Sequence, residues 1–276
     1  MGLEVPVDNL ADMSPDGARL EVQAVKFAYN GVNVLDEVSF LVPHGERVAV
    51  VGPNGAGKST LFKALVGLIP VQSGKILIHG KPLGSHQDCV AYIPQREEVD
   101  WQFPVTVEDV VMMGRYGRIG WLKTPGKIDR QVVATCMEQM GLQDLARRPI
   151  SNLSGGQQQR IFLARALAQE PHILLMDEPF TGIDITTQDL IFNLLDALRQ
   201  QKVTVLVSTH DLNMAAQRFD RTLLIKRKVI AYGTAAEVFT PNAIKQAFGS
   251  QVLFLNDTVI ADHCCPGDEH NHTDLG

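Results

Sequence analysis

The chain has 276 residues, 45% of them hydrophobic and 20% charged, with a formal net charge of −6 at pH 7. This length predicts a globular chain with a full hydrophobic core, and the acidic balance argues against nucleic-acid binding and against electrostatic anchoring to a membrane. No apolar run approaches the roughly 20 residues of a membrane-spanning helix, and the acidic N-terminal region lacks the features of a signal peptide. We therefore expect a soluble, cytosolic chain.

The first hundred residues are rich in strand signals. Alternation and short apolar runs predict strands at 20–25, 32–42, 47–51, 75–78 and 91–93. The run at 47–51 has no polar alternation, which is typical of a strand buried on both faces. It leads into a glycine-rich loop, and a helix is expected at 58–68, with Gly67 near its end.

The middle of the chain, from about 96 to 160, has few strand signals. Thr106 to Asp109 resembles a capping box that opens a helix through Met113, and a second helix at 129–140 is expected to stop at Gly141. We interpret this block as a helical subdomain.

Strand–helix alternation then returns. Strands are predicted at 172–176 and 203–208, and helices at 187–200 and 211–218. Such alternation predicts an α/β fold with a mostly parallel sheet. Hairpin-like pieces and a small helix at 243–248 are expected after it.

The glycine-rich loop has the spacing of a phosphate-binding loop. It lies between a predicted strand and a predicted helix, and it consists of Gly52, Pro53, Asn54, Gly55, Ala56, Gly57, Lys58, Ser59 and Thr60. Backbone N–H groups in such a loop, and the N-terminus of the following helix, bind phosphate anions. Lys58 is expected to contact the β- and γ-phosphates and Ser59 to bind Mg²⁺. The alternative is a glycine turn with a surface lysine.

Two acids close the apolar strand at 173–177. Ligands of parallel sheets lie at the carboxyl ends of the strands, so Asp177 is expected to hold Mg²⁺ through water. Glu178 follows directly and could polarise an attacking water. A strand-end ion pair is the alternative.

Leu153 to Gln157 reads Leu-Ser-Gly-Gly-Gln before a predicted helix, so Ser154, Gly155, Gly156 and Gln157 can present a hydroxyl and N–H groups to an anion. A simple helix cap is the alternative. With the phosphate loop and the Asp-Glu strand, this segment resembles the ATP-binding-cassette (ABC) ATPases, and the resemblance covers about residues 20–249. It implies that the anion is the γ-phosphate of ATP held by a second subunit.

The resemblance also assigns residues that spacing alone does not. Tyr29 resembles the aromatic that stacks on adenine, although Phe27 competes for that role. Gln95 resembles the glutamine that senses Mg²⁺ and links the subdomains. Asp184, in a Thr-Gly-Ile-Asp loop that departs from the commoner Ser-Ala-Leu-Asp, resembles the acid of the dimer contact. His210 resembles the histidine that contacts the γ-phosphate, and a structural histidine is the alternative.

These matches imply a phosphate-loop (RecA-like) α/β core with an antiparallel β subdomain and an inserted helical subdomain. We expect an N-terminal extension at 1–18, the ATPase domain at 19–250 and a C-terminal hairpin with a loose His/Cys tail at 251–276. ATP and Mg²⁺ are the implied cofactors. The implied assembly is a head-to-tail dimer, expected to be a homodimer.

The segment after Gln95, with Gly120-Trp121-Leu122, is similar to the manganese, zinc and iron importer branch of the family. That similarity implies an integral membrane permease, a separate metal-binding solute-binding protein and a place at the cytoplasmic face of the membrane. Trp101, Phe103, Met112 and Met113 are candidates for the permease dock, with the subdomain's own core as the alternative for the methionines. Siderophore, haem or cobalamin import, a non-transport ABC ATPase and an ATP-sensing module without turnover stay open as alternatives.

Four cysteines complete the inventory. Cys89 and Cys136 stand in apolar stretches and are expected to be small core residues. Cys264 and Cys265 lie in a tail with His263, His270 and His272, residue types that suit a transition metal, although a disordered polar tail is the default expectation.

Overall fold

The structure is a computed structural model of the chain, and it describes residues 20–29, 31–84, 89–120, 123–249, 252–255 and 258–261. The expected N-terminal extension, Trp121 and Leu122, and the His/Cys tail lie outside these ranges. None of the helices in the described ranges is both long enough and apolar enough to cross a membrane.

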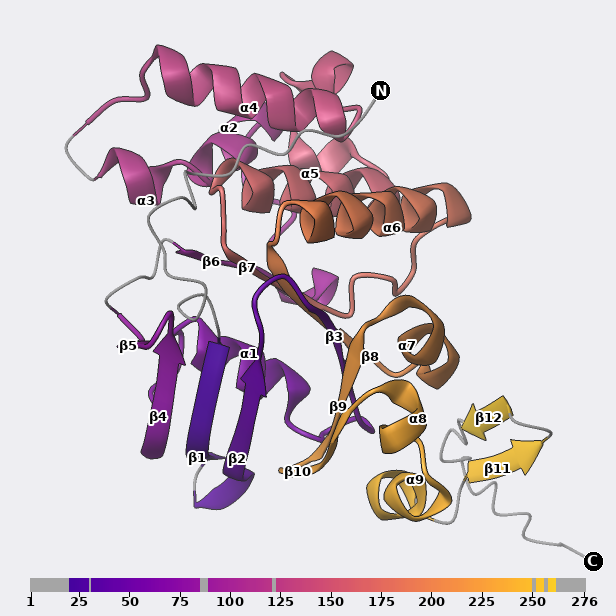
Figure 1. The fold of residues 1–276 in the computed structure, drawn as a ribbon. Helices are drawn as coiled ribbons and strands as arrows, with labels where there is room; N and C mark the ends of the chain where they lie inside the picture. The colour runs from indigo at the N-terminus through magenta and orange to yellow at the C-terminus, as the bar shows by residue number, and fades with distance from the viewer. Residues whose placement is uncertain are drawn as a thin grey trace, which may run out of the picture.

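A six-stranded sheet forms the centre of the molecule (Figure 1). Its order is β10-β9-β3-β8-β7-β6, and the adjacent pairs from β9 to β6 are parallel while β10 is antiparallel. The strands are β3 (Arg47–Val51), β6 (Val90–Ile93), β7 (Ile173–Asp177), β8 (Thr204–Thr209), β9 (Arg221–Lys226) and β10 (Lys228–Gly233).

Both faces of this sheet are covered, which explains the apolar runs in the sequence. Along β3, Ala49 and Val51 pack into one hydrophobic core, whereas Val48 and Val50 pack into the other. A strand whose successive side chains enter two different cores has no position for a polar residue, so alternation is lost.

The second core lies between the central sheet and a four-stranded antiparallel sheet of order β2-β1-β4-β5. Its strands are β1 (Leu20–Tyr29), β2 (Val32–Val42), β4 (Ser73–Ile78) and β5 (Lys81–Pro82). Helix α1 (Lys58–Leu65) contributes Leu61, Phe62 and Leu65 to this core. The helix ends three residues before the expected limit because Gly67 has a positive φ and the Leu68 N–H donates to the Lys63 carbonyl, a Schellman-type stop.

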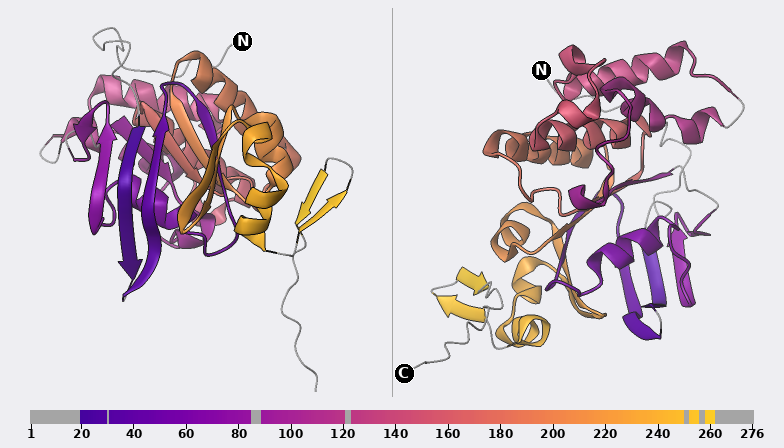
Figure 2. Two further views of the ribbon diagram at one scale, coloured as in Figure 1. Left: turned by 60° about the horizontal axis from the view of Figure 1, so that its bottom comes forward. Right: turned by 180° about the vertical axis from the view of Figure 1, so that it is seen from behind.

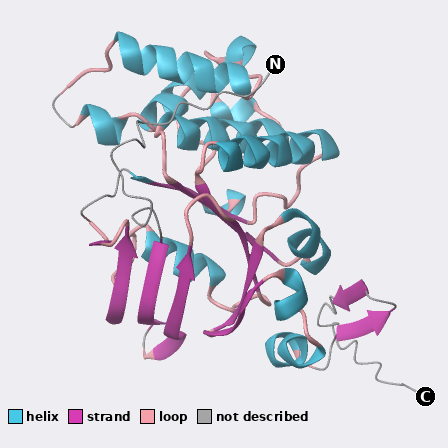
Figure 3. Ribbon diagram, viewed as in Figure 1, coloured by secondary structure: helices cyan, strands magenta, loops and turns pink. Residues whose placement is uncertain are grey.

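Helices gather at the opposite end of the molecule (Figures 2 and 3). They are α2 (Val107–Met113), α3 (Tyr116–Ile119), α4 (Lys127–Gln139) and α5 (Gly155–Ala168), and α6 (Ile185–Gln200) packs beside them. The expected capping box is present: Thr106 accepts from the Asp109 N–H at 3.3 Å, and Asp109 accepts from the Thr106 N–H at 3.0 Å. Helix α4 begins two residues earlier than expected because Asp129 caps the Gly126 N–H.

The chain closes with α7 (Leu212–Arg218), α8 (Ala235–Val238), α9 (Pro241–Phe248) and the antiparallel pair β11 (Val252–Leu255) and β12 (Thr258–Ala261). Helix α9 begins two residues before the expected limit, with Thr240 as its N-cap. The prediction for the cysteines is half right. Cys136 is fully buried in the core, whereas Cys89 is only half-buried and lies beside two histidines.

Candidate functional site

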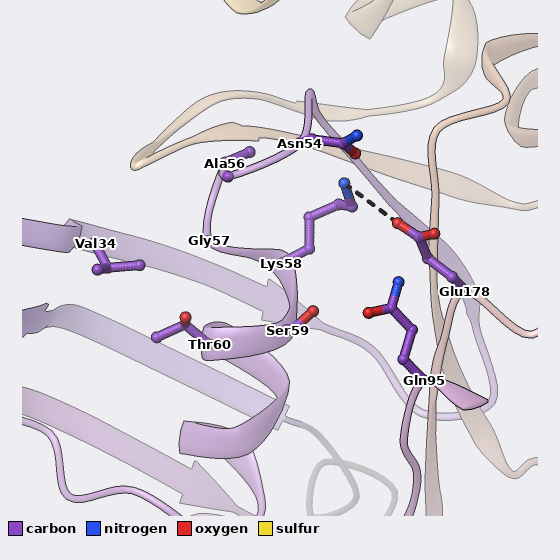
Figure 4. A pocket seen from close by; sticks show the side chains of 10 residues that line it. Val34, Asn54, Ala56, Gly57, Lys58, Ser59, Thr60, Gln95 and Glu178 are labelled. Atoms are coloured by element: carbon purple, nitrogen blue, oxygen red, sulfur yellow. Dashed lines mark ion pairs between the residues drawn. The ribbon is translucent and has the colours of Figure 1, made fainter. Parts of the chain in front are cut away.

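The glycine-rich loop joins β3 to α1 and lines a cavity of about 390 Å³ (Figure 4). Gly57 caps α1 with φ of 99°, a left-handed conformation that favours glycine. A Cβ there would lie 2.9 Å from the Leu35 side chain and the Val34 carbonyl oxygen, so the loop runs tightly against β2. The loop thereby presents its N–H groups and the α1 N-terminus to the cavity, an arrangement suited to an anion.

Lys58 is buried and extends into this cavity. Its Nζ donates to the Gly52 carbonyl at 2.9 Å and lies 3.8 Å from a carboxylate oxygen of Glu178 (Figure 4). Burial lowers the pKa of Lys58, and the charges of Glu178 and Asp177 oppose that effect. The ammonium is a cation taken out of water, and a phosphate group in the cavity would stabilise it.

Asp177 lies at the carboxyl end of β7 and is almost fully buried. It accepts a short hydrogen bond from the Ser208 hydroxyl and also interacts with the Ser59 hydroxyl. Burial raises its pKa, and the hydrogen bonds from Ser208 and Ser59 offset part of that rise. The carboxylate is held at the base of the site, where a cation would relieve its desolvation.

Glu178 connects this cavity to a second one. Its side chain lines the loop cavity and also a cavity of about 310 Å³ that includes His210, Thr181 and Asp211. Its carboxylate lies 3.9 Å from the His210 Nδ1. The residue has φ of 47°, an uncommon conformation for a non-glycine residue that costs of order 1–3 kcal/mol. The turn after β7 aims this carboxylate between Lys58 and His210 at the expense of backbone strain.

Gln95 faces the loop from the other side of the same cavity (Figure 4). It precedes the 3₁₀ helix Arg96–Glu98, and the Arg96 Nε donates to the Gln158 side chain of α5 at 3.0 Å. The segment that follows Gln95 is therefore bonded directly to the helical block.

The Leu-Ser-Gly-Gly-Gln segment lies elsewhere in the same chain. Ser154 caps α5 and shares a capping box with Gln157, with contacts of 3.3 and 3.0 Å. Gly156 packs against the start of α6, where Asp184 accepts from the Thr187 N–H at 2.9 Å. None of these residues lines the cavity of the phosphate loop. The Leu-Ser-Gly-Gly-Gln segment, called the signature segment below, thus lies away from the phosphate-loop cavity of its own chain. The residues that one chain brings together are Lys58, Ser59, Gln95, Asp177, Glu178 and His210.

The two aromatic candidates near the start of the chain differ sharply in exposure. Tyr29 is 60% exposed, whereas Phe27 is 7% exposed and meets the Tyr29 ring edge-on at 5.1 Å. Phe27 belongs to the core, so Tyr29 is the ring with an accessible face. Tyr29 is not among the residues that line the loop cavity.

Sequence reasoning missed three residues that shape the site. Ser208 bonds Asp177 and also accepts from the Glu178 N–H at 2.9 Å, the Tyr92 hydroxyl donates to Asp177 at 3.4 Å, and Val34 lines the cavity. The one sequence signal for Ser208 is that it is a polar residue closing the predicted apolar strand 203–208, whereas its pairing with Asp177 in the parallel register of β7 and β8 comes from the structure. Tyr92 and Val34 carry no comparable signal.

Comparisons with known proteins agree with this geometry. The family described as "ABC transporter" matches residues 35–181. The manganese transport system ATP-binding protein MntB of Bacillus subtilis is 46% identical over 88% of this chain and 97% of its own length. The zinc transport system ATP-binding protein TroB of Treponema pallidum is 44% identical over 88% of this chain and 91% of its own length.

Solved structures show the same fold. A chain of a metal-chelate type ABC transporter in an inward-facing conformation superposes with a TM-score of 0.73 and 30% identity, covering 87% of this chain and 94% of that one. A nucleotide-free ATP-binding cassette gives a TM-score of 0.72 at 22% identity, covering 82% of this chain and 97% of that one. With a phosphate loop, an acid pair and a separate signature helix in this arrangement, the chain belongs to the ABC transporter family as an ATP-binding cassette.

Proposed function

We propose that this chain is the ATP-hydrolysing subunit of an importer for divalent transition metals, namely manganese, zinc or iron, and that it powers a separate membrane permease. The observation that carries the proposal is near full-length similarity, at 44–46% identity, to ATP-binding subunits of manganese and zinc transport systems. The ATP-binding cassette is the enzyme, and the metal is cargo that need not touch this chain.

In this proposal ATP lies in the loop cavity, with its phosphates against the loop N–H groups and Lys58. The donor set fits Mg²⁺, because the Ser59 hydroxyl, the Gln95 amide oxygen and the Asp177 carboxylate are hard oxygen ligands close to the same cavity. Ser59, Gln95 and Asp177 would hold the ion, which neutralises phosphate charge when bound with ATP.

Glu178 and His210 act at the γ-phosphate end. Glu178 orients and polarises the attacking water, since its carboxylate lies between Lys58 and His210 at 3.8 and 3.9 Å. His210 contacts the γ-phosphate. Lys58 stabilises the charge that develops on the transferred phosphoryl group.

Two chains are needed to complete the site. The N-terminus of α5 and Ser154 do not line the phosphate-loop cavity of their own chain. We therefore propose that Ser154, Gly155, Gly156 and Gln157 bind the γ-phosphate held by a second copy. Asp184 lies at the Gly156 contact and belongs to the same interface. The dimer closes only when the γ-phosphate is present, and it reopens after hydrolysis removes that phosphate. The dimer therefore has two states, open and closed, whose populations depend on the bound nucleotide.

The permease is proposed to dock on the helical block near Gln95. Phe103 is 56% exposed and Met113 38% exposed there, whereas Met112 is buried and belongs to the core. Trp101 packs edge-on against Phe162 of α5 at 5.2 Å. Because Arg96 ties the Gln95 segment to α5, a partner held at Phe103 and Met113 would sense the state of the nucleotide site.

The test is the metal content of cells that carry wild-type protein or Glu178→Gln, measured for manganese, zinc, iron and cobalt. Glu178→Gln should bind ATP and close but fail to turn over, so one metal should fall selectively and identify the cargo. Unchanged content of all four metals, with ATPase activity lost, would favour the chelate importers or a non-transport role.

Two in vitro measurements check the mechanism separately. Wild-type ATPase activity of Glu178→Gln would refute the role of that carboxylate. Ser154→Arg should abolish ATPase activity while leaving ATP binding to the isolated chain, and unchanged ATPase activity would refute the contribution of the second copy.

A further inference from the structure

Three residues with metal-binding side chains lie close together and do not line the cavity of the phosphate loop. One donor atom each of His79, Cys89 and His172 lies within 4.8 Å of the other two. The His79 Nε2 and the His172 Nδ1 are 3.0 Å apart, and the two rings meet edge-on at 5.1 Å. All three residues are half-buried, so the cluster is shielded and yet within reach of solvent.

The fold positions each member rigidly. Cys89 and His172 directly precede β6 and β7, and the His172 N–H donates to the Cys89 carbonyl at 2.8 Å, which extends the parallel ladder by one step. His79 comes from the other sheet, in the two-residue turn between β4 and β5. Its φ of 52°, followed by 72° at Gly80, is that of a type I′ hairpin turn.

The donor types and their spacing select the ion. Two imidazoles and a thiolate suit borderline transition metals such as Zn²⁺ and are poor ligands for Mn²⁺, which prefers oxygen and stands lowest in the first-row affinity order. Tetrahedral ligation with Zn–N distances of about 2.05 Å separates two nitrogens by roughly 3.3 Å, close to the separation seen between the histidines.

We propose that His79, Cys89 and His172 form a binding site for Zn²⁺ or a similar borderline divalent cation, with a fourth position open to water. Binding releases the Cys89 thiol proton to solvent. The imidazole that donates in the His79–His172 pair moves its proton to its other ring nitrogen, so that both facing nitrogens become ligands. The bound ion would cross-link the two β-sheets at a point outside the nucleotide cavity.

The proposed site does not depend on which metal the importer carries. In a manganese importer it would respond to a competing metal and not to the transported one. The proposal stands without the proposed cargo, because it rests only on the geometry of these three side chains.

The probe is Co²⁺ titrated into the full chain and followed by absorption, since thiolate ligation gives a charge-transfer band and four-coordinate Co²⁺ absorbs strongly in the visible. The tail also contains residue types that bind metal, so the reference protein carries serine or asparagine in place of His263, Cys264, Cys265, His270 and His272. This reference should bind one Co²⁺ with a thiolate band, and Zn²⁺ but not equimolar Mn²⁺ should displace it.

Matched variants of the reference identify the ligands. Cys89→Ser should remove the thiolate band. Cys136→Ala, which changes a thiol buried in the core, is the control and should keep the band. His79→Asn is the sharpest test, because asparagine suits the left-handed turn position and leaves the hairpin intact. It should weaken Co²⁺ binding by more than the roughly 10–100-fold that loss of an outer-shell partner costs.

Circular dichroism and ATP binding, unchanged in each variant, establish that the fold is retained. Absence of the thiolate band in the reference protein would overturn the proposal. A band that survives Cys89→Ser, or an affinity that His79→Asn leaves unchanged, would overturn it equally.

Discussion

Gly156 is a position where one added methyl group should disturb the packing of two helices. It is the second residue of α5, and a Cβ placed there would lie 2.7 Å from the Thr187 Oγ1 and 2.8 Å from an Asp184 carboxylate oxygen. Both atoms belong to the capped start of α6, where Thr187 is buried and bonded to Asp184. Gly156→Ala therefore forces the starts of two helices apart.

Three terms set the magnitude. Alanine inside a helix is favoured over glycine by about 1 kcal/mol. Overpacking costs about 1–3 kcal/mol, and disturbing the Asp184 cap costs about 0.5–2 kcal/mol more. We therefore expect Gly156→Ala to lower the free energy of unfolding by about 0.5–4 kcal/mol.

Gly155→Ala is the matched control one residue earlier. Its Cβ would meet the tip of the exposed Arg96 side chain at 2.9 Å, and that tip can move. We expect no loss of stability, because the preference of a helix for alanine, at most about 1 kcal/mol, offsets the displacement of the Arg96 tip.

Urea unfolding followed by circular dichroism measures both variants. The penalty of alanine at 156 should also shrink in a Thr187→Ala background, because one of the two obstructing atoms is gone. Equal stability of Gly155→Ala and Gly156→Ala, or a penalty unaffected by Thr187→Ala, would refute the packing argument.

Three further predictions concern single side chains. Because the folded pKa of Asp177 is raised, the folded state holds more protons than the unfolded state between the two pKa values, and the contribution of Asp177 to stability falls as pH rises through that window. Without nucleotide, Asp177→Asn should then unfold at higher urea than wild type, by a margin that grows as pH rises above the ordinary pKa of an aspartate. A pH-independent difference would contradict this. Tyr29→Ala should raise the KM for ATP with little change in kcat if the exposed ring stacks on adenine, and an unchanged KM in steady-state kinetics would remove that role. Arg115 is 5% exposed and is bonded to Asp129 and Glu170 at 3.1 and 2.7 Å. Arg115→Ala should lower the free energy of unfolding in urea by about 3–5 kcal/mol, because two partly buried carboxylates lose their partner. A loss below about 1 kcal/mol would show that water replaces the guanidinium group.

Local sequence signals predicted much of the secondary structure. The strand 47–51 and the capped helix ending at Met113 were predicted to within a residue, because an unbroken apolar run and a capping box are local signals. The predicted helix limits differ from the observed ones by two or three residues at α1, α4, α6 and α9, where a glycine stop or a capping residue sets the limit. The family resemblance supplied the overall architecture, which periodicity alone did not contain.

The sequence by itself determined the loop, the acid pair and the signature segment, because each is a contiguous string whose chemistry is local. Only the tertiary structure decided what meets across the chain. The parallel register of β7 and β8 places Ser208 beside Asp177, and the turn after β7 places Glu178 between Lys58 and His210. The β4–β5 hairpin and the β6–β7 ladder bring His79 close to Cys89 and His172. Those contacts join residues 10 to more than 100 positions apart, and their separation in space depends on how the sheets pack, which no local pattern records.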